Sequence, residues 1–301
     1  MTKFSVCIPT YNRAYLIRKP LDSLVNQTFK DFEVLVVDDG STDNTDEIVE
    51  PYKEKLNLKY IKKPNGGKHT ALNTSLDHAQ GELWIILDSD DEFVETALGE
   101  MNNIWEEYKD NPMICGIIGR SSVNGKLIGR PFEKDQEFIS YVEFHFGLYG
   151  GQYGDCCECL RTETLKKYRW PENLETKFVP ECYVFDQIGL TCKLVIANNN
   201  LVFKKVYYKE DGITMNVEAF VRKNLHGYLF NSISEIENII PNAKQDEITF
   251  RAKKDIWINY YNLKRMDKNG EGPKVKRKTV LGLTVWIYIN IRSKIYKILH
   301  R

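Results

Sequence analysis

The chain has 301 residues, 42% of them hydrophobic and 28% charged, and its 42 basic and 42 acidic residues cancel. This composition excludes a disordered or fibrous chain and is typical of a globular protein with one large domain, or a domain and an appendage. The charge is uneven, because residues 271–301 carry a net +7 and the rest of the chain a net −7. An acidic body argues against general nucleic-acid binding, whereas the basic tail suits an anionic surface.

The N-terminus and the cysteines indicate the compartment. Met1 is followed almost at once by an apolar segment, so we expect no signal peptide. The seven cysteines are scattered without a disulfide framework, which is typical of a reducing cytoplasm. Cys156, Cys157 and Cys159 form a cluster without zinc-site spacing, and we interpret them as small buried side chains, with a metal site as the alternative.

Apolar segments alternate with amphipathic ones over the first 120 residues. We predict strands at 4–8, 32–37, 58–61, 83–87 and 113–118, and helices from about Ile17, where Pro20 kinks or delays the start, and at 44–52, 68–79 and 94–108. Asn44 with Glu47 is typical of a capping box. Unbroken apolar strands separated by helices predict an α/β fold, with a mostly parallel central sheet flanked by helices.

Three of these strands end in unusual residues, which are Pro9-Thr10-Tyr11-Asn12, Asp38-Asp39 and Asp88-Ser89-Asp90-Asp91. Ligands of parallel sheets bind at the carboxyl ends of the strands. Crowded carboxylates repel one another unless a cation neutralises them, and Mg²⁺ or Mn²⁺ on carboxylates usually also contacts substrate phosphates. The alternative is an acidic turn that caps the next helix, and the convergence of three strand ends favours the metal. A dinucleotide fold is disfavoured, because no Gly-x-Gly-x-x-Gly follows the first strand.

The pattern loosens after residue 120. Asn124-Gly125 predicts a hairpin turn. We predict further helices at 160–168, after Glu181, at 217–240 and at 247–264, and closing strands at 194–202 and 204–208. Segment 279–291 is free of charge but shorter than the ~20 residues that span a bilayer. Its basic flanks predict an interfacial amphipathic helix on anionic lipid, or a helix packed on the body with a solvated basic face.

The chain resembles the family 2 inverting glycosyltransferases through three motifs in order, Ile8–Asn12, Val37–Ser41 and Leu87–Asp91. The match covers about residues 3–215, and two further stretches, Gly66–Asn73 and Lys177–Glu181, resemble members that build bacterial surface polysaccharides. The resemblance implies a GT-A nucleotide-sugar-binding fold. It implies a catalytic domain at 1–215, which leaves a helical extension at 216–270 and a basic amphipathic tail at 271–301.

The same resemblance implies a UDP-sugar donor and a Mn²⁺ or Mg²⁺ ion. It assigns donor contacts to nine residues: Pro9, Thr10, Tyr11, Asn12, Asp39, Lys68, Asp88, Ser89 and Asp90. Asp39 would read the N3–H of uracil, and Asp90 would bind the metal with Asp91 as a helper. A further metal ligand of the family is often a His near the end of the domain, but no His closely follows Asp211.

Inversion requires a base that takes the proton of the acceptor hydroxyl. Glu181 is the candidate that the resemblance gives, and Asp186 is the second. The alternative for Glu181 is an acid at a helix N-terminus, where the dipole favours it. Asp155 and Glu158 are expected to line the acceptor pocket, while the histidines, including His145, are expected to be structural or on the surface.

These features predict a metal-dependent inverting glycosyltransferase that moves a sugar from a UDP-sugar to a glycan or lipid-linked acceptor in cell-surface polysaccharide synthesis. We expect it in the cytoplasm, peripheral on the inner face of the membrane, and without a nucleic-acid partner. The alternative is a UDP-sugar-binding protein that does not catalyse. A nucleotidyltransferase ranks last, because no Gly-rich phosphate loop follows the first strand.

Overall fold

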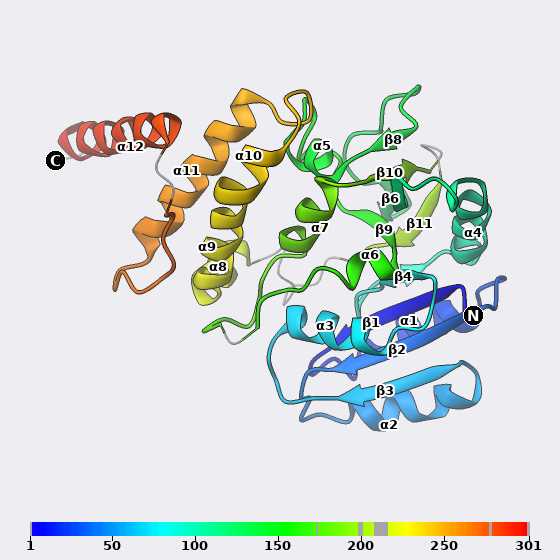
Figure 1. The fold of residues 1–301 in the computed structure, drawn as a ribbon. Coiled ribbons are helices and arrows are strands. Elements are labelled where there is room, and N and C mark those ends of the chain that lie inside the picture. Colours follow the sequence, from blue (N-terminus) through cyan, green and yellow to red (C-terminus); the bar gives the residue numbers. More distant parts are fainter. Residues whose placement is uncertain (1, 173, 198–200, 208–215, 277–278, 300–301) are drawn as a thin grey trace.

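Strands and helices alternate through the first 123 residues (Figure 1), as the sequence predicts. The computed structural model describes residues 2–172, 174–197, 201–207, 216–276 and 279–299. The elements of this first part are β1 (Phe4–Thr10), α1 (Arg18–Val25), β2 (Phe32–Asp38), α2 (Thr45–Val49), the 3₁₀ helix η1 (Glu50–Glu54), β3 (Leu58–Lys62), α3 (Lys68–His78), β4 (Leu83–Ile86), β5 (Glu92–Phe93), α4 (Ala97–Tyr108) and β6 (Ile114–Val123). Because α1 begins at Arg18, Pro20 lies in its first turn, where proline is tolerated.

Shorter elements follow, and helices dominate the end of the chain. They are β7 (Lys126–Leu127), β8 (Phe138–Ile139), α5 (Tyr141–Phe146), β9 (Cys156–Arg161), α6 (Thr162–Leu165), α7 (Cys182–Gly189), β10 (Lys193–Ile196), β11 (Val202–Lys205), α8 (Val217–Lys223), α9 (Leu225–Ser234), the π-helix η3 (Glu235–Ile239), α10 (Ile240–Asn242), α11 (Phe250–Met266) and α12 (Val280–Leu299). The turn at Asn124-Gly125 is confirmed, since both residues have positive φ between β6 and β7.

One sheet of the described residues organises the fold, with the strand order β3-β2-β1-β4-β9-β6-β10-β8. Strand β1 pairs in parallel with β2 and with β4, and β2 pairs in parallel with β3. Strand β9 runs antiparallel between β4 and β6. The carboxyl ends of β1, β2 and β4 therefore meet at one edge, as the parallel pattern predicts.

Helices cover both faces of the sheet, and β1 shows how its residues divide between them. Phe4, Val6 and Ile8 are fully buried and belong to the core beneath α1 and α4. Cys7 points to the opposite face and belongs to the core beneath α3 and α7. Burying each large apolar side chain stabilises the fold by about 1.5–3 kcal/mol.

A third apolar core joins the C-terminal helices, and it includes Leu229 of α9, Ile236 of η3 and Trp257 of α11. These helices stand to one side of the sheet, and α12 projects beyond α11 (Figure 1). Val285 and Ile289 of α12 are buried in the third core. Within the described ranges, we find no helix with the length and hydropathy needed to cross a bilayer.

Several local predictions were wrong. Residues 160–168 do not form one helix, because Leu160 and Arg161 belong to β9 and only Thr162–Leu165 is helical. The predicted helix at 217–240 is divided at Asn224 and continues as α9 and η3. The side chain of Asn44 makes no capping bond, because Asp43 instead accepts hydrogen bonds from the backbone N–H and the hydroxyl of Thr45.

The cysteines show no disulfide framework in the sequence, yet two of them are paired. Cys115 and Cys192 form a disulfide, with their Cα atoms 5.9 Å apart. The two residues are 77 positions apart, and the parallel pairing of β6 with β10 brings them together. No spacing rule reveals a pair that depends on strand register. Cys156, Cys157 and Cys159 are free and buried, as expected.

Candidate active site

A cleft of about 670 Å³ opens at the carboxyl ends of β1, β2 and β4. Many sequence-predicted residues line it: Pro9, Thr10, Tyr11, Asp39, Lys68, Asp88, Ser89, Asp90, Asp91 and Asp155. The helical extension closes the other side through Phe220 and Lys223 of α8, together with Asn224. Motifs from three separate strand ends therefore meet in one cavity.

Asn12 and Asp39 hold the loops at the strand ends in place. Asn12 does not line the cleft; its side-chain oxygen accepts a hydrogen bond from the Thr42 backbone N–H at 2.8 Å. The buried Asp39 carboxylate accepts hydrogen bonds from the N–H groups of Gly66 and Gly67 at 2.8 and 2.6 Å, and from Lys63 Nζ at 2.8 Å. A carboxylate has about four acceptor sites, so Asp39 keeps little capacity for a ligand.

The Asp39 contact requires glycine at position 67. Gly67 has a φ of +99°, and a Cβ atom there would lie 2.0 Å from the carbonyl oxygen of Lys177. Gly67 directly precedes α3, so its backbone directs the first residue of that helix, Lys68, into the cleft.

Lys68 joins two carboxylates that come from distant parts of the chain. Its Nζ lies 2.6 Å from Asp88 Oδ1 and 2.7 Å from Glu181 Oε1. Burial would lower the pKa of Lys68, but the two carboxylates raise it above its ordinary value. Burial likewise works against ionisation of Asp88, yet Lys68 and Lys204 hold the pKa of Asp88 below normal. This ion-pair chain places Glu181 beside the strand-end carboxylates.

The pKa values of Asp90 and Asp91 are raised, in contrast to that of Asp88. Burial and the nearby Asp88 raise the pKa of Asp90. Burial raises the pKa of Asp91 to about 7, although Lys204 opposes the shift. Since these carboxylates are short of positive charge, a divalent cation with oxygen ligands fits them.

Lys204 is a site residue that the sequence analysis missed. It lies on β11 with only 6% of its surface exposed. Its Nζ lies 3.6 Å from Asp91 Oδ2 and 3.4 Å from Asp155 Oδ1. The signal was available, because a lysine in a buried strand requires a partner of opposite charge.

Only one of the two residues predicted to line the acceptor pocket, Asp155 and Glu158, lies at the cleft. Asp155 lines the cleft, whereas Glu158 lies on β9 outside it. Burial raises the pKa of Glu158 to about 7, and Lys204 works against this shift.

The two candidate catalytic bases, Glu181 and Asp186, have different partners. Neither carboxylate lines the cleft, but Glu181 is ion-paired with Lys68, which does, whereas Asp186 is only 2% exposed. Asp186 is hydrogen-bonded to the ring of His145 on α5. Burial lowers the pKa of His145, but Asp186 outweighs it and raises that pKa above the ordinary value. The segment after Asp211, where the further metal ligand was considered, lies outside the described residues.

Comparison with known proteins agrees with this arrangement. The chain is 36% identical over 161 residues to the GalNAc(5)-diNAcBac-PP-undecaprenol beta-1,3-glucosyltransferase of Campylobacter jejuni, covering 51% of this chain and 50% of that protein. It is 38% identical over 139 residues to the poly(ribitol-phosphate) beta-N-acetylglucosaminyltransferase TarS of Staphylococcus aureus, covering 45% of this chain and 24% of TarS. The chain thus spans half or less of the length of these two relatives.

Solved structures share the fold. The S. aureus TarS fragment in complex with UDP-GlcNAc has a TM-score of 0.61 at 24% identity, covering 95% of this chain and 79% of that one. The mannosyltransferase PcManGT of Pyrobaculum calidifontis, in complex with GDP-Man and Mn²⁺, has a TM-score of 0.58 at 18% identity, with coverages of 96% and 80%. The fold is therefore GT-A, as expected. The sequence profile of Glycosyl transferase family 2 matches residues 5–161, and the chain belongs to this family.

Proposed function

We propose that the protein is an inverting glycosyltransferase that transfers a sugar from a UDP-sugar to a glycan or lipid-linked acceptor in cell-surface polysaccharide synthesis. The observation that carries the proposal is the cleft, where the strand-end motifs meet Lys68, which is ion-paired with Glu181. The curated relatives support this acceptor class, because one is named for an undecaprenol-linked glycan and the other for poly(ribitol-phosphate). The TarS complex with UDP-GlcNAc supports the donor class.

In this proposal, the nucleotide lies along the β1 and β2 ends of the cleft. Tyr11 is 47% exposed at its mouth, where its ring can stack on the base. Asp39 acts mainly by fixing the loop at Gly66 and Gly67, and its remaining acceptor capacity faces the base. Lys68 supplies positive charge for the diphosphate while it orients Glu181.

Asp90 and Asp91 would hold Mn²⁺ or Mg²⁺, which would supply charge compensation for the departing diphosphate. The fit rests on this cleft's own chemistry, since burial and neighbouring carboxylates raise the pKa values of both groups. Lys204 already neutralises part of this charge, so the carboxylates stay together when no ion is bound.

We assign the base to Glu181 rather than Asp186. Glu181 lies within the ion-pair chain of the cleft, while Asp186 faces His145 and the helical extension. A base that accepts the acceptor's proton contributes roughly 10²–10⁴-fold to the rate. Glu181→Gln should lose turnover on that scale while UDP binding is retained, and Asp186→Asn should retain turnover. The opposite pattern would transfer the role to Asp186.

The test of the whole proposal is a screen of nucleotide sugars, with and without Mn²⁺, that measures UDP release. We expect release with a UDP-sugar and Mn²⁺, and loss of release in Asp90→Ala. Full activity of Asp90→Ala would refute the metal assignment. UDP-sugar binding without turnover, for the wild type with undecaprenol-linked and polyol-phosphate acceptors, would favour the non-catalytic alternative.

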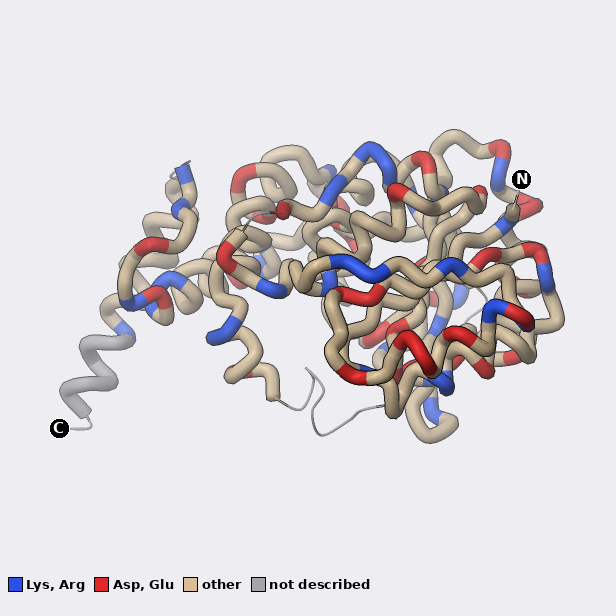
Figure 2. Tube along the Cα trace, turned by 90° about the horizontal axis from the view of Figure 1, so that it is seen from below, with Lys and Arg blue, Asp and Glu red and all other residues tan. Residues whose placement is uncertain are grey.

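We also propose that α12 contacts anionic lipid from the cytoplasmic side. Charged residues of both signs are interspersed over the body (Figure 2), whereas α12 exposes apolar side chains, among them Val280 at 84%, Leu283 at 58% and Trp286 at 49%. The sequence flanks this face with basic residues. Deletion of residues 274–301 should release the protein from anionic vesicles. Equal binding by the truncated chain would refute the contact.

A further inference from the structure

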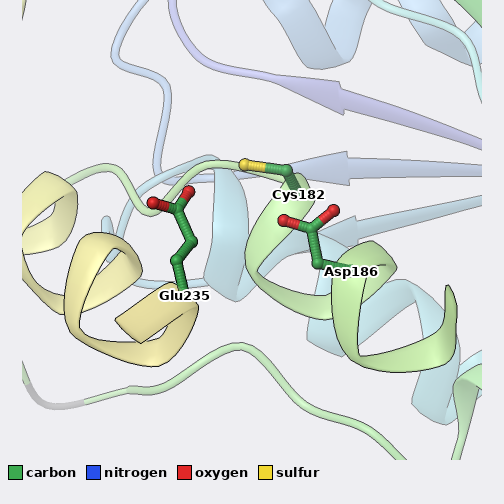
Figure 3. A group of neighbouring side chains, drawn as sticks. All are labelled: Cys182, Asp186 and Glu235. Carbon is green, nitrogen blue, oxygen red and sulfur yellow. The ribbon is translucent and has the colours of Figure 1, made fainter. Parts of the chain in front are cut away.

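A cluster of metal-ligating side chains lies between the GT-A body and the helical extension, apart from the cleft. Cys182 and Asp186 are one turn apart on α7, and Glu235 is the first residue of η3 (Figure 3). One ligand atom from each lies within 4.8 Å of the other two. The three side chains point toward one another from two separate elements.

Asp186 is oriented as a metal ligand is. One carboxylate oxygen is hydrogen-bonded to the ring of His145. The other, Oδ2, is buried and has no hydrogen-bond partner. A buried carboxylate oxygen without a partner is costly, whereas a metal ligand commonly has one atom fixed by a neighbour and the other on the ion.

Glu235 is held in a similar way. Asn231, one turn earlier on α9, donates from Nδ2 to Glu235 Oε1 at 2.7 Å. The side-chain oxygen of Asn231 also accepts from the Cys182 thiol at 3.7 Å. The backbone at Glu235 is a π-helical turn, a feature that is frequent at functional sites. Asn231 thus orients two of the three ligands.

Charge and access also suit a cation. The cluster brings three potential anions together, and Asp186 and Glu235 among them are buried. His145 brings at most one positive charge, so a divalent ion would complete neutrality. His145 and Glu235 also line a cavity of about 540 Å³ that lies between the 146–152 loop and α11. This cavity gives an ion a path and leaves room for a water ligand.

We propose that Cys182, Asp186 and Glu235 form a second divalent-metal site, of the class that Zn²⁺ occupies. Sulfur with carboxylate oxygens is a zinc donor set, and thiolate ligation separates this site from the all-oxygen site at Asp90 and Asp91. Zinc bonds of about 2.0–2.3 Å place tetrahedral ligands roughly 3.3–3.8 Å apart, so small side-chain rotations suffice. The ion fastens α7 to η3, and thereby the extension to the GT-A body.

Cobalt gives a selective test, because sulfur ligation produces a thiolate-to-cobalt charge-transfer band that oxygen ligands do not give. The full chain is stripped with a chelator and titrated with Co²⁺. We expect the band in the wild type, in Asp90→Ala and in the control Cys156→Ser, and its loss in Cys182→Ser. Asn231→Ala should weaken Co²⁺ binding by about 10–100-fold, as loss of a supporting neighbour does.

A second measurement covers variants that fold poorly. Zn²⁺ should raise the melting temperature of the wild type and Asp90→Ala, each measured against its own metal-free state, but not that of the double variant Asp90→Ala/Glu235→Gln, in which both proposed sites are disrupted. Absence of the band in the wild type, or its persistence in Cys182→Ser, would overturn the site. An equal zinc-induced shift in Asp90→Ala and in the double variant Asp90→Ala/Glu235→Gln would overturn it too.

Discussion

Asp39→Asn tests whether Asp39 builds the cleft or only reads the ligand. Lys63 Nζ and the Gly66 N–H both donate to Asp39 Oδ1, and the Gly67 N–H donates to Oδ2. An asparagine can keep its oxygen toward Lys63 and Gly66. Its NH₂ group then faces the buried N–H of Gly67, so two donors meet and one hydrogen bond is lost.

The cost follows from these contacts. Hydrogen bonds to a charged group contribute about 1.5–3 kcal/mol each, and an unsatisfied buried donor costs about 1–3 kcal/mol. The replacement also removes the ion pair with Lys63. We therefore expect Asp39→Asn to lower the free energy of unfolding by about 2–4 kcal/mol, with no ligand present.

Thermal unfolding measures this effect, since 1 kcal/mol shifts the melting temperature by about 2–4 °C in chains of 150–250 residues. The exposed Asp110→Asn is the matched control and should stay within about 0.5 kcal/mol of the wild type. UDP binding, measured by calorimetry on the folded fraction, separates the two roles. An unchanged melting temperature with lost UDP affinity would refute the structural role. Recognition of the uracil ring would then be the only role of Asp39.

Three more predictions concern the cleft and its surroundings. Lys204→Met should lower the free energy of unfolding by about 3–5 kcal/mol at pH 8, because it leaves buried carboxylates without their partner. The loss should be smaller at pH 5, because Asp91 has a pKa of about 7 and is protonated there. Urea denaturation at both pH values measures the difference. Glu158 has a pKa raised from 4.5 to about 7, so wild-type stability should fall as pH rises across that window, and Glu158→Gln should flatten the melting-temperature profile. Gly67→Ala should cost at least about 1–3 kcal/mol, because of its positive φ and the Lys177 carbonyl, and chemical denaturation should show the loss; an unaffected variant would contradict the packing.

The strand ends could be predicted from the sequence because their signals are local. Unbroken apolar runs mark buried parallel strands, and the polar residues directly after them must meet at one edge of the sheet. Hence Tyr11, Asp39 and Asp90 line a common cleft, as expected. The family resemblance added the nucleotide chemistry that periodicity alone does not contain.

Other features depend on tertiary neighbours, and the sequence hid them. His145 and Asp186 are 41 positions apart, and the packing of α5 against α7 creates their hydrogen bond. The last two residues of β9 were predicted as the start of a helix at 160–168, but the place of the strand between β4 and β6 makes them extended. Lys204 was visible in the sequence as a charged residue in an apolar strand, but only the fold shows which carboxylates it contacts.

The position of Lys204 bears on how the cleft tolerates its own charge. Four carboxylates, Asp88, Asp90, Asp91 and Asp155, lie near one another, and Lys204 contacts two of them from inside the sheet. Because Lys204 is buried, its charge is screened little by salt, and it stabilises the metal-free cleft at low and high ionic strength. It contacts Asp91 and Asp155 but not Asp90, whose pKa stays raised by burial and by Asp88. Asp90 thus lines the cavity with its charged form disfavoured, and a divalent ion bound there would favour that form and could at the same time contact an anionic diphosphate.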